Sequence, residues 1–512
     1  MKSFERVKHI HGKDYLYRIT PYYDKSSKKI KQRSTYIGPV REGKVVEKTA
    51  ITYTYGDLIP VMKAVRDLKL DQILEKILKE YASTILVLAV NRIIRPESMN
   101  NVRTWYEDSY ISNIYDVDLS SSTLSRVMES IGSMNPNHSF LREIIPTAGD
   151  TTAMYYDLTS FSSHSREMEF LEYGYSRSDP DLPQVNVSMV ETRTGIPVFY
   201  DLYPGSVVDI TTVRNTVQVL KSAGIKELRL IMDRGMFSTS NIEYLISENM
   251  DFIMPASFTL KGVKKLALLS RRTIERGSNI MQINGEIMFA MKHKLDIGSA
   301  IINTFVYYDQ KRDSLERNAF YSSLYERIRR LEQHVVKKWE KPATVVEEIM
   351  SSYRNFISWR YTDKFTVKMK ENAISQRINR CGITIITFTG DHDAHEILDE
   401  YRKRDSVEKL FLSSKSFTGA EPLRVHKIET LRGELFVNMI ALAIRSRILI
   451  EMRENDLMKK YSVEKMILEL QKLRKVILQD GKEITTEMTR KQKEILTKFS
   501  ISLNDVPTFL KS

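Results

Sequence analysis

Six side chains of this sequence have the types and spacing that phosphodiester chemistry requires. Two are aspartates that follow apolar, strand-like runs, Asp157 in AMYYDLTS and Asp233 in ELRLIMDRG. The other four share the stretch YRKRDSVEKLFLSSK, where they stand at Tyr401, Arg404, Glu408 and Lys415. Carboxylates can hold divalent cations, and an arginine, a lysine and a tyrosine can bind a phosphate backbone.

The stretch from Tyr401 to Lys415 is expected to be helical, because it follows the strand-like run GITIITFT and an acidic lead-in. At about 100° per residue, its four side chains fall within roughly 60° of arc and point the same way. One aromatic, two cations and one carboxylate suit a face that offers one metal ligand and also grips phosphates. The alternative is a solvated face with an Arg404–Glu408 pair at i,i+4 spacing.

Asp157 and Asp233 are expected to project from the ends of neighbouring strands, where ligands gather in an α/β sheet. Their charges would repel each other unless a cation lies between them. Two Mg²⁺ ions about 4 Å apart, or Mn²⁺ in their place, suit such carboxylates, with Glu408 as the third ligand. Each aspartate also has a plainer interpretation: a turn begun by Asp157, or a pair between Asp233 and Arg234.

The elements around the two aspartates predict a mixed sheet covered by helices. Three strand-like runs follow one another between residues 152 and 204, and the two that follow the aspartate strand are close enough to pair as antiparallel neighbours. Asp209 and Ser238 are then expected to cap helices, each followed by another strand. The order β, β, β, α, β, α, β is that of a ribonuclease-H-like fold, so we predict an α/β core with a mixed five-stranded sheet.

The rest of the chain is expected to form further regions around this core. They are an N-terminal β-rich region with a β-hairpin at 1–50, a helical, DNA-binding region at 51–150, the first part of the core at 151–256, an insertion domain at 257–381, the second part of the core with the glutamate helix at 382–450, and a helical C-terminal region at 451–512. In the insertion, Asn284–Gly285 predicts a hairpin. The helix bearing Ser122, Thr123, Ser125 and Arg126 is either a helix-turn-helix reader of DNA or an ordinary capped helix.

Composition narrows the class of protein. The 512 residues are 42% hydrophobic and 28% charged, as in ordinary globular proteins with several domains. A net charge of +13 favours a polyanionic partner, above all nucleic acid. The single Cys381 excludes an internal disulfide and a cysteine metal cluster. Because no apolar run reaches the roughly 18 residues of a membrane span, we expect no membrane contact and a cytoplasmic location.

The four residues between 401 and 415 match the pattern Y-x2-R-x3-E-x6-K in register. This resembles the signature of a large class of bacterial and archaeal insertion-sequence transposases with a DDE triad. YYDLTS and IMDRGMF resemble the two aspartate segments of that class, and the resemblance covers about residues 150–445. It implies a ribonuclease-H-like core in which Asp157, Asp233 and Glu408 are catalytic and bind metal. It further implies three residues that grip the transposon-end backbone: Tyr401, Arg404 and Lys415.

The resemblance also implies a reaction and partners. In cut-and-paste transposition, water releases a 3′-hydroxyl at the transposon end, a hairpin forms and is reopened, and the freed ends attack target DNA. The partners would be double-stranded DNA, as terminal inverted repeats and as target, and a second copy of the chain in a synaptic homodimer. Location would be the nucleoid of a prokaryotic cell. The alternatives are a ribonuclease-H-like DNA nuclease, which does not need the four-residue pattern, and a non-catalytic, transposase-derived DNA-binding protein.

Overall fold

The structure is a computed structural model of the chain, which divides into two compact units. It describes residues 3–10, 13–24, 29–41, 44–45, 50–165, 168–173, 182–207, 209–225, 228–405, 425–478 and 480–511. The larger unit comprises Asp67–Ala82 and Ser125–Arg447 and contains both aspartates. The smaller unit comprises Met1–Arg66, Ser83–Leu124 and Ile448–Ser512.

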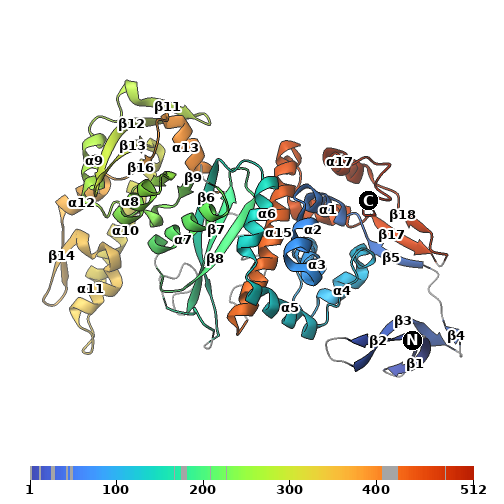
Figure 1. Cartoon of the computed structure of the whole chain (residues 1–512). Coiled ribbons are helices and arrows are strands. Elements are labelled where there is room, and N and C mark those ends of the chain that lie inside the picture. The colour runs from blue at the N-terminus through green and yellow to red at the C-terminus, as the bar shows by residue number, and fades with distance from the viewer. Residues whose placement is uncertain are drawn as a thin grey trace. The chain divides into compact units, whose positions relative to one another are not determined.

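The larger unit contains a nine-stranded mixed sheet with the order β11-β12-β13-β16-β10-β9-β6-β7-β8 (Figure 1). In chain order, the strands are β6 (Ala153–Ser162), β7 (Gln184–Thr192), β8 (Pro197–Pro204), β9 (Arg229–Met232), β10 (Asp251–Pro255), β11 (Ile280–Ile283), β12 (Glu286–Ile297), β13 (Ala300–Tyr308) and β16 (Ile383–Phe388). Every position of β6 and β7 is buried, as in strands covered on both faces.

The first five strands follow the predicted element order. β6, β7 and β8 are antiparallel neighbours, and β9 pairs in parallel with both β6 and β10. Helix α7 (Asp209–Ser222) connects β8 to β9, and α8 (Thr239–Ser247) connects β9 to β10. The side chain of Ser238 accepts the Asn241 N–H and so begins α8, as predicted.

The predicted size of the sheet is wrong, because the sheet has nine strands rather than five. β16, from the region predicted as the second part of the core, pairs with β10. β13 pairs with β16, β12 with β13 and β11 with β12, so strands from the region predicted as an insertion extend the same sheet. An unpaired edge at β10 would leave a row of backbone groups without partners, and β16 satisfies them. The hairpin predicted at Asn284–Gly285 is confirmed, since these residues join β11 to β12.

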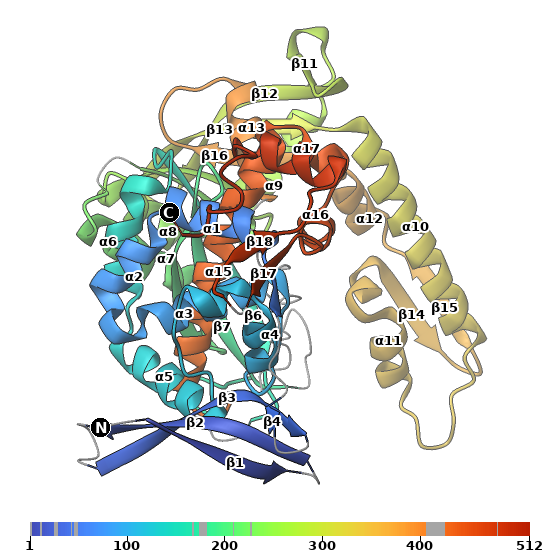
Figure 2. The ribbon, with the colours of Figure 1, turned by 90° about the vertical axis from the view of Figure 1, so that its right-hand side faces the viewer.

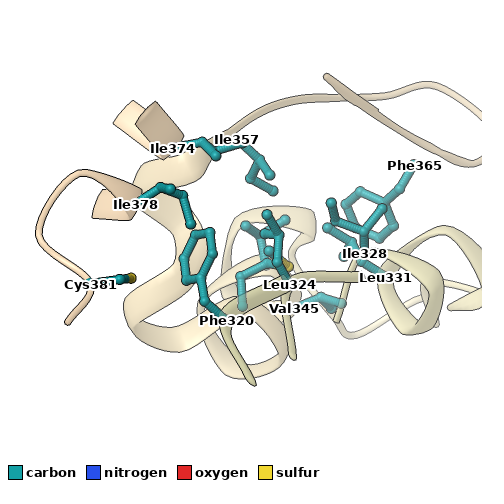
Figure 3. Close-up of a cluster of buried hydrophobic side chains, with 12 residues drawn as sticks. Phe320, Leu324, Ile328, Leu331, Val345, Ile357, Phe365, Ile374, Ile378 and Cys381 are labelled. Carbon is teal, nitrogen blue, oxygen red and sulfur yellow. The ribbon is translucent and has the colours of Figure 1, made fainter. Parts of the chain in front are cut away.

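Residues 310–381 form a small α/β module with a core of its own, which we call the charged module (Figure 2). Its elements are α10 (Gln310–Gln333), α11 (Pro342–Met350), β14 (Ile357–Tyr361), β15 (Phe365–Met369) and α12 (Glu371–Ile378). Among the strands that the structure describes, β14 and β15 pair with each other and with no third strand. Figure 3 shows the buried side chains that these elements share, among them Phe320, Leu324, Ile357, Phe365 and Ile374.

Two glycines allow helices of the larger unit to approach closely. A Cβ atom on Gly132 of α5 (Ser121–Met134) would lie 1.8 Å from the Glu429 carbonyl oxygen of α15 (Ile428–Glu454). One on Gly433 would lie 2.3 Å from the Met128 carbonyl oxygen. Any larger residue would therefore force the two backbones apart. The Tyr200 hydroxyl donates to the Arg432 carbonyl at 3.0 Å and ties α15 to β8.

Four further helices lie wholly or mainly in the larger unit. They are α2 (Leu70–Leu78), α6 (Asn137–Ile144), α9 (Lys261–Arg271) and α13 (Ala394–Lys403). The rings of Phe140 in α6 and Phe436 in α15 meet edge to face at 5.7 Å. Helix α6, which lies within the first 150 residues, therefore packs against α15.

The smaller unit contains a four-stranded antiparallel sheet, so the predicted N-terminal hairpin is part of a larger element. Its strands are β1 (Phe4–Ile10), β2 (Lys13–Asp24), β3 (Lys29–Arg41) and β4 (Lys44–Val45). Helices that lie wholly or mainly in this unit include α1 (Leu58–Asp67), α3 (Ala82–Ile94), α4 (Val102–Asp108), α16 (Val463–Leu470) and α17 (Arg490–Lys498). Among the helices of the described residues, none combines the length and apolar character that crossing a membrane requires.

The C-terminal region, predicted as helical, contains strands as well as helices. β17 (Arg474–Leu478) and β18 (Glu483–Thr485) form a hairpin, and β17 also pairs with β5 (Ala50–Thr54). The turn contains Asp480–Gly481, and the strands on either side carry β-branched residues; this hairpin signal is obscured by the charged composition of the region.

The helix-turn-helix interpretation of α5 stays a prediction. The hydroxyl of Thr123 donates to Asp118 at 2.8 Å, a local contact at the start of this helix. The Ser120 N–H also bonds to Asp118, at 2.9 Å. Both contacts are those of a capped helix start, and a DNA-reading helix can begin in the same way.

Candidate active site

Asp157 and Asp233 lie at neighbouring positions of two parallel strands. β6 and β9 pair in the register Tyr156↔Met232, and each aspartate is the next residue along its chain. β9 ends at Met232, and Asp233 is the N-cap residue of a short 3-10 helix. The topology of the sheet therefore brings together two carboxylates that are 76 positions apart in the sequence.

Asp157 lies within its strand and not at the strand end, where the sequence placed it. β6 continues to Ser162, and Asp157 pairs with Met189 of β7. Its exposed fraction is 7%. β6 runs on because β7 provides a partner along its whole length, whereas β9 ends one residue before the level of Asp157. The acid pair thus lies where one strand stops and its neighbour continues.

Arg404 lies between the two carboxylates. Its Nη1 is 3.7 Å from Asp157 Oδ1, and its Nη2 is 3.8 Å from Asp233 Oδ1. The arginine is itself buried, with 6% of its surface exposed. Two neighbouring carboxylates repel each other unless a positive charge lies close, and the guanidinium supplies that charge. Tyr401 belongs to the same group, since the Arg404 guanidinium carbon is 5.6 Å from the centre of its ring.

Helix α13 carries Tyr401 toward the acid pair, with a start that differs from the prediction. The helix begins after Asp393, whose side chain accepts the Glu396 N–H, so the acidic lead-in is part of it. It ends at Lys403, and the Arg404 N–H bonds to the Tyr401 carbonyl in a tightened last turn. Arg404 keeps helical backbone angles, φ −56° and ψ −23°, and Asp405 is again helical, so the stretch is helical as predicted as far as it is described, apart from this tightened turn. Glu408 and Lys415 lie outside the described residues.

Glu400 and Arg193 fix the end of α13, and no motif in the sequence marks either of them. The side chain of Glu400 is 3% exposed, and its Oε1 accepts Arg193 Nε at 3.1 Å and Lys403 Nζ at 3.0 Å. Arg193 lies in the turn after β7 and also contacts Asp150 at 3.3 Å. The hydrogen bond to Glu400 is the main cause that raises the pKa of Arg193. Glu400 therefore anchors the helix one turn before Arg404.

The surroundings of this anchor are buried and acidic. Tyr155 and Glu191 face each other across β6 and β7, and both are almost completely buried. Burial raises the pKa of the Tyr155 hydroxyl, and the charges of Glu400 and Glu191 raise it further. Tyr155 lies two residues before Asp157, so their side chains share one face of β6. The Arg193 and Arg404 cations thus lie among several carboxylates at the end of α13.

The acid pair fits part of a site for a divalent cation. Asp157 and Asp233 offer hard carboxylate oxygens, the ligands that Mg²⁺ and Mn²⁺ prefer, but a stable site needs at least one more ligand. Among the described residues, no group of three His, Cys, Asp or Glu side chains is arranged to hold a metal ion. The predicted third carboxylate, Glu408, lies outside them, so it is neither placed in nor removed from the site.

A mixed sheet with an acid pair on adjacent parallel strands is typical of enzymes that act on phosphodiesters. The family model for the transposase DDE domain matches residues 159–444, more than half of the chain, and the chain belongs to this family. The protein is therefore a DNA transposase, an enzyme of DNA cleavage and strand transfer. The matched range begins two residues after Asp157 and includes Asp233, Tyr401 and Arg404.

Solved structures give a weaker likeness. Among them is the cryo-EM structure of the piggyBac transposase synaptic complex with hairpin DNA, at 11% sequence identity and a TM-score of 0.38. The alignment covers 81% of this chain and 79% of that chain. No curated protein matches this sequence.

Proposed function

We propose that this transposase is an insertion-sequence enzyme whose DDE triad is Asp157, Asp233 and Glu408. The observation that carries the proposal is the buried Arg404, whose guanidinium nitrogens lie within 4 Å of a carboxylate oxygen of each aspartate. The element order β, β, β, α, β, α, β supports a ribonuclease-H-like core, extended here by four strands to the nine of the sheet. On this proposal, the region 257–381 is an insertion that shares the sheet of the core.

The three carboxylates would hold two Mg²⁺ ions, with Mn²⁺ able to replace them. Bound ions of this kind activate water or a 3′-hydroxyl and stabilise the leaving oxygen of an in-line phosphoryl transfer. Asp157 lies within β6, which pairs with β7 on one side and with β9, as far as Tyr156, on the other side. The sheet therefore holds the backbone of Asp157 in a defined position. Rigid placement of the reacting groups accounts for much of the rate enhancement in such reactions.

The remaining predicted residues would hold the DNA end. The guanidinium of Arg404 can bind a phosphate through two parallel N–H donors. A phosphate that approaches the acid pair competes with the carboxylates for this guanidinium, so Arg404 links end binding to the catalytic acids. Tyr401, whose ring lies beside Arg404, would stack on a base or donate its hydroxyl, and Lys415 would neutralise a further phosphate.

The proposed reaction is cut-and-paste transposition of double-stranded DNA. The terminal inverted repeats would be cleaved and joined to target DNA, and a homodimer would hold two ends together. The region 51–150 would contribute to DNA binding. Such an enzyme would act at the nucleoid in the cytoplasm of a prokaryotic cell.

Cleavage of labelled duplexes from the ends of the encoding DNA element tests the proposal. We expect Mg²⁺-dependent nicking by the wild type and none by Asp233→Asn or Glu408→Gln, with DNA affinity retained in both variants. Asp251→Asn is a matched control, because Asp251 is an exposed aspartate at the first position of β10 in the same sheet. Binding of Mn²⁺, followed by electron paramagnetic resonance, should weaken in Asp233→Asn and not in the control. Wild-type nicking by Asp233→Asn would contradict the proposed triad.

A further inference from the structure

Two segments of the chain carry more than its entire net charge. Residues 1–50 contain 13 lysines and arginines against five acidic residues, and the charged module, 310–381, contains 16 against nine. The other 390 residues contain 49 cationic and 51 acidic side chains. The sheet that carries the acid pair therefore belongs to a nearly neutral part of the chain. The positive field that attracts a phosphate backbone must come largely from the two charged segments.

The hairpin of the charged module separates its two faces by residue type. On one face, Ile357 and Phe365 belong to the module core, and Trp359 contacts Phe365 with ring centres 5.9 Å apart. The opposite face presents four exposed side chains: Ser358, Arg360, Thr366 and Lys368. The register Ser358↔Lys368 and Arg360↔Thr366 puts the hydroxyls and cations side by side. Cations interleaved with hydroxyls are the side chains that contact phosphate oxygens in protein–DNA complexes.

Acidic side chains do not offset this face. The structure describes all residues from 357 to 370, and within the two strands there is no aspartate or glutamate. Lys364 in the turn and Lys370 after β15 are also exposed. Asp363 in the turn is the one acidic residue of the hairpin. The outer face of the hairpin is therefore a patch of positive charge on two strands whose other face packs in the module core.

The loop between α10 and α11 adds an exposed aromatic residue to the module. Trp339 is 78% exposed and Val335 is 81% exposed. Lys337 lies over the Trp339 ring, with Nζ 5.5 Å from its centre. Glu340 accepts the Lys337 N–H at 3.0 Å and contacts His334 at 3.0 Å, which fixes the loop. An exposed tryptophan beside lysines marks an interaction site, and its ring can pack against the sugars of a DNA duplex while the lysines contact phosphates.

We propose that the charged module is a DNA-binding surface distinct from the catalytic acids. The outer face of β14 and β15 would bind the phosphate backbone of duplex DNA, and Trp339 would pack against the same duplex. Backbone contacts carry no sequence information, so the surface would bind duplexes of any sequence. That the ligand is DNA rests on the proposed function, whereas the hairpin and its exposed cations are observed independently of that function.

Salt dependence of binding tests the hairpin face directly. The full-length protein is titrated, without divalent metal, into a random-sequence duplex and into a transposon-end duplex at several salt concentrations. Every phosphate that the protein no longer neutralises should lower the slope of log K against log[salt] by about 0.9. For the triple variant Arg360→Gln, Lys364→Gln, Lys368→Gln, we expect a slope lower by about two to three on both duplexes, with at least a roughly tenfold weaker affinity at low salt.

A matched variant removes the same charge elsewhere. Arg490→Gln, Lys491→Gln, Lys493→Gln neutralises three exposed cations on α17 of the smaller unit and should keep the wild-type slope. Equal slopes for the hairpin variant and the wild type would overturn the proposal, and so would equal decreases in the two triple variants. Trp339→Ala removes no charge, so we expect a weaker affinity at an unchanged slope.

Cleavage assays keep this inference separate from the proposed function. At saturating protein, the hairpin variant should nick transposon ends at the wild-type rate in Mg²⁺, because the acid pair is unchanged. If the wild type fails to nick but the hairpin variant lowers the salt slope, the proposed function fails and the binding surface stands. If the wild type nicks and the slope does not change, the binding surface fails and the proposed function stands.

Discussion

The acid pair and the charged module handle charge in opposite ways. At the acid pair, Asp157 and Arg404 are buried and each lies within 4 Å of an opposite charge. In the charged module, Arg360 and Lys368 are exposed on a support that has its own apolar core. Burying a charge is costly unless it is paired, so each buried group needs a defined position, while exposed charges act through their number. Substitutions should therefore change the rate of chemistry at one region and DNA affinity at the other.

Arg404→Gln should have the largest effect, because it leaves two facing carboxylates without their cation. We expect the free energy of unfolding to fall by about 3–5 kcal/mol and end cleavage to be lost. Adding Asp157→Asn should restore part of the stability, since it removes one of the two repelling charges. Urea unfolding measures both, and Arg402→Gln on the same helix is the control. If Arg404→Gln lowered DNA affinity alone, Arg404 would belong with the exposed cations and not with the acid pair.

Leu324→Ala tests whether the charged module is a separate folding unit. Leu324 is 1% exposed in the module core (Figure 3), and its truncation should cost about 2–5 kcal/mol. We expect faster hydrogen exchange and proteolysis confined to residues 310–381, with weaker DNA binding. Leu315→Ala on the same helix is the matched control, since Leu315 is 63% exposed. Exchange that increased equally in β6 and β7 would show that the module and the sheet unfold as one.

The anchor of α13 should show an asymmetric response to substitution. Arg193→Gln leaves the buried Glu400 carboxylate with fewer donors and should cost about 2–3 kcal/mol. Glu400→Gln leaves a partly exposed arginine that water can solvate, so it should cost about 1 kcal/mol. The double variant measures the coupling energy, which we expect to be about 1 kcal/mol. Equal costs for the two single variants, with no coupling, would mean that this ion pair does not hold the helix end.

Local signals in the sequence predicted much of the core. The cap at Ser238 and the turn at Asn284–Gly285 depend on a few adjacent residues, and both lie where they were expected. The order of strands and helices placed Asp157 and Asp233 on neighbouring strands. These features are set by backbone preferences that act over four or five residues, which is the range that a single sequence reveals.

Features set by distant partners were not predictable. β6 continues past Asp157 because β7 pairs with it along its whole length, and the sheet extends to nine strands because β16 covers the edge of β10. The contact between Arg193 and Glu400 joins residues 207 positions apart, and no local pattern marks either one. Tertiary packing decides such features. The sequence therefore indicated which residues could do chemistry, but it did not predict the contacts that hold each of them in place.

Asp57 is a second buried aspartate, and comparing it with Asp157 tests how a nearby arginine affects a buried carboxylate. It is fully buried just before α1, where its Oδ1 accepts the Leu58 N–H at 3.0 Å. Unlike Asp157, it has no arginine within ion-pair distance among the described residues. Burial raises its pKa to about 7, although the Leu58 hydrogen bond opposes the shift. Asp57 therefore illustrates a buried carboxylate that favours its neutral form.

The consequence is a pH-dependent decrease in stability that Asp57→Asn should remove. The folded state binds the Asp57 proton more tightly than the unfolded chain, whose pKa is near 3.8. The stabilisation is thus complete below about pH 4 and is lost as pH rises through about 7. Asparagine stays neutral, but its amide would need a new acceptor, which costs the variant the same stability at every pH. We therefore expect the variant to gain stability relative to wild type as pH rises from about 4 to about 8, by roughly 1.4 kcal/mol for each unit of the pKa shift. Urea unfolding across this pH range should show this gain, with the exposed Asp71→Asn as control. A difference independent of pH would mean that Asp57 stays charged in the folded protein.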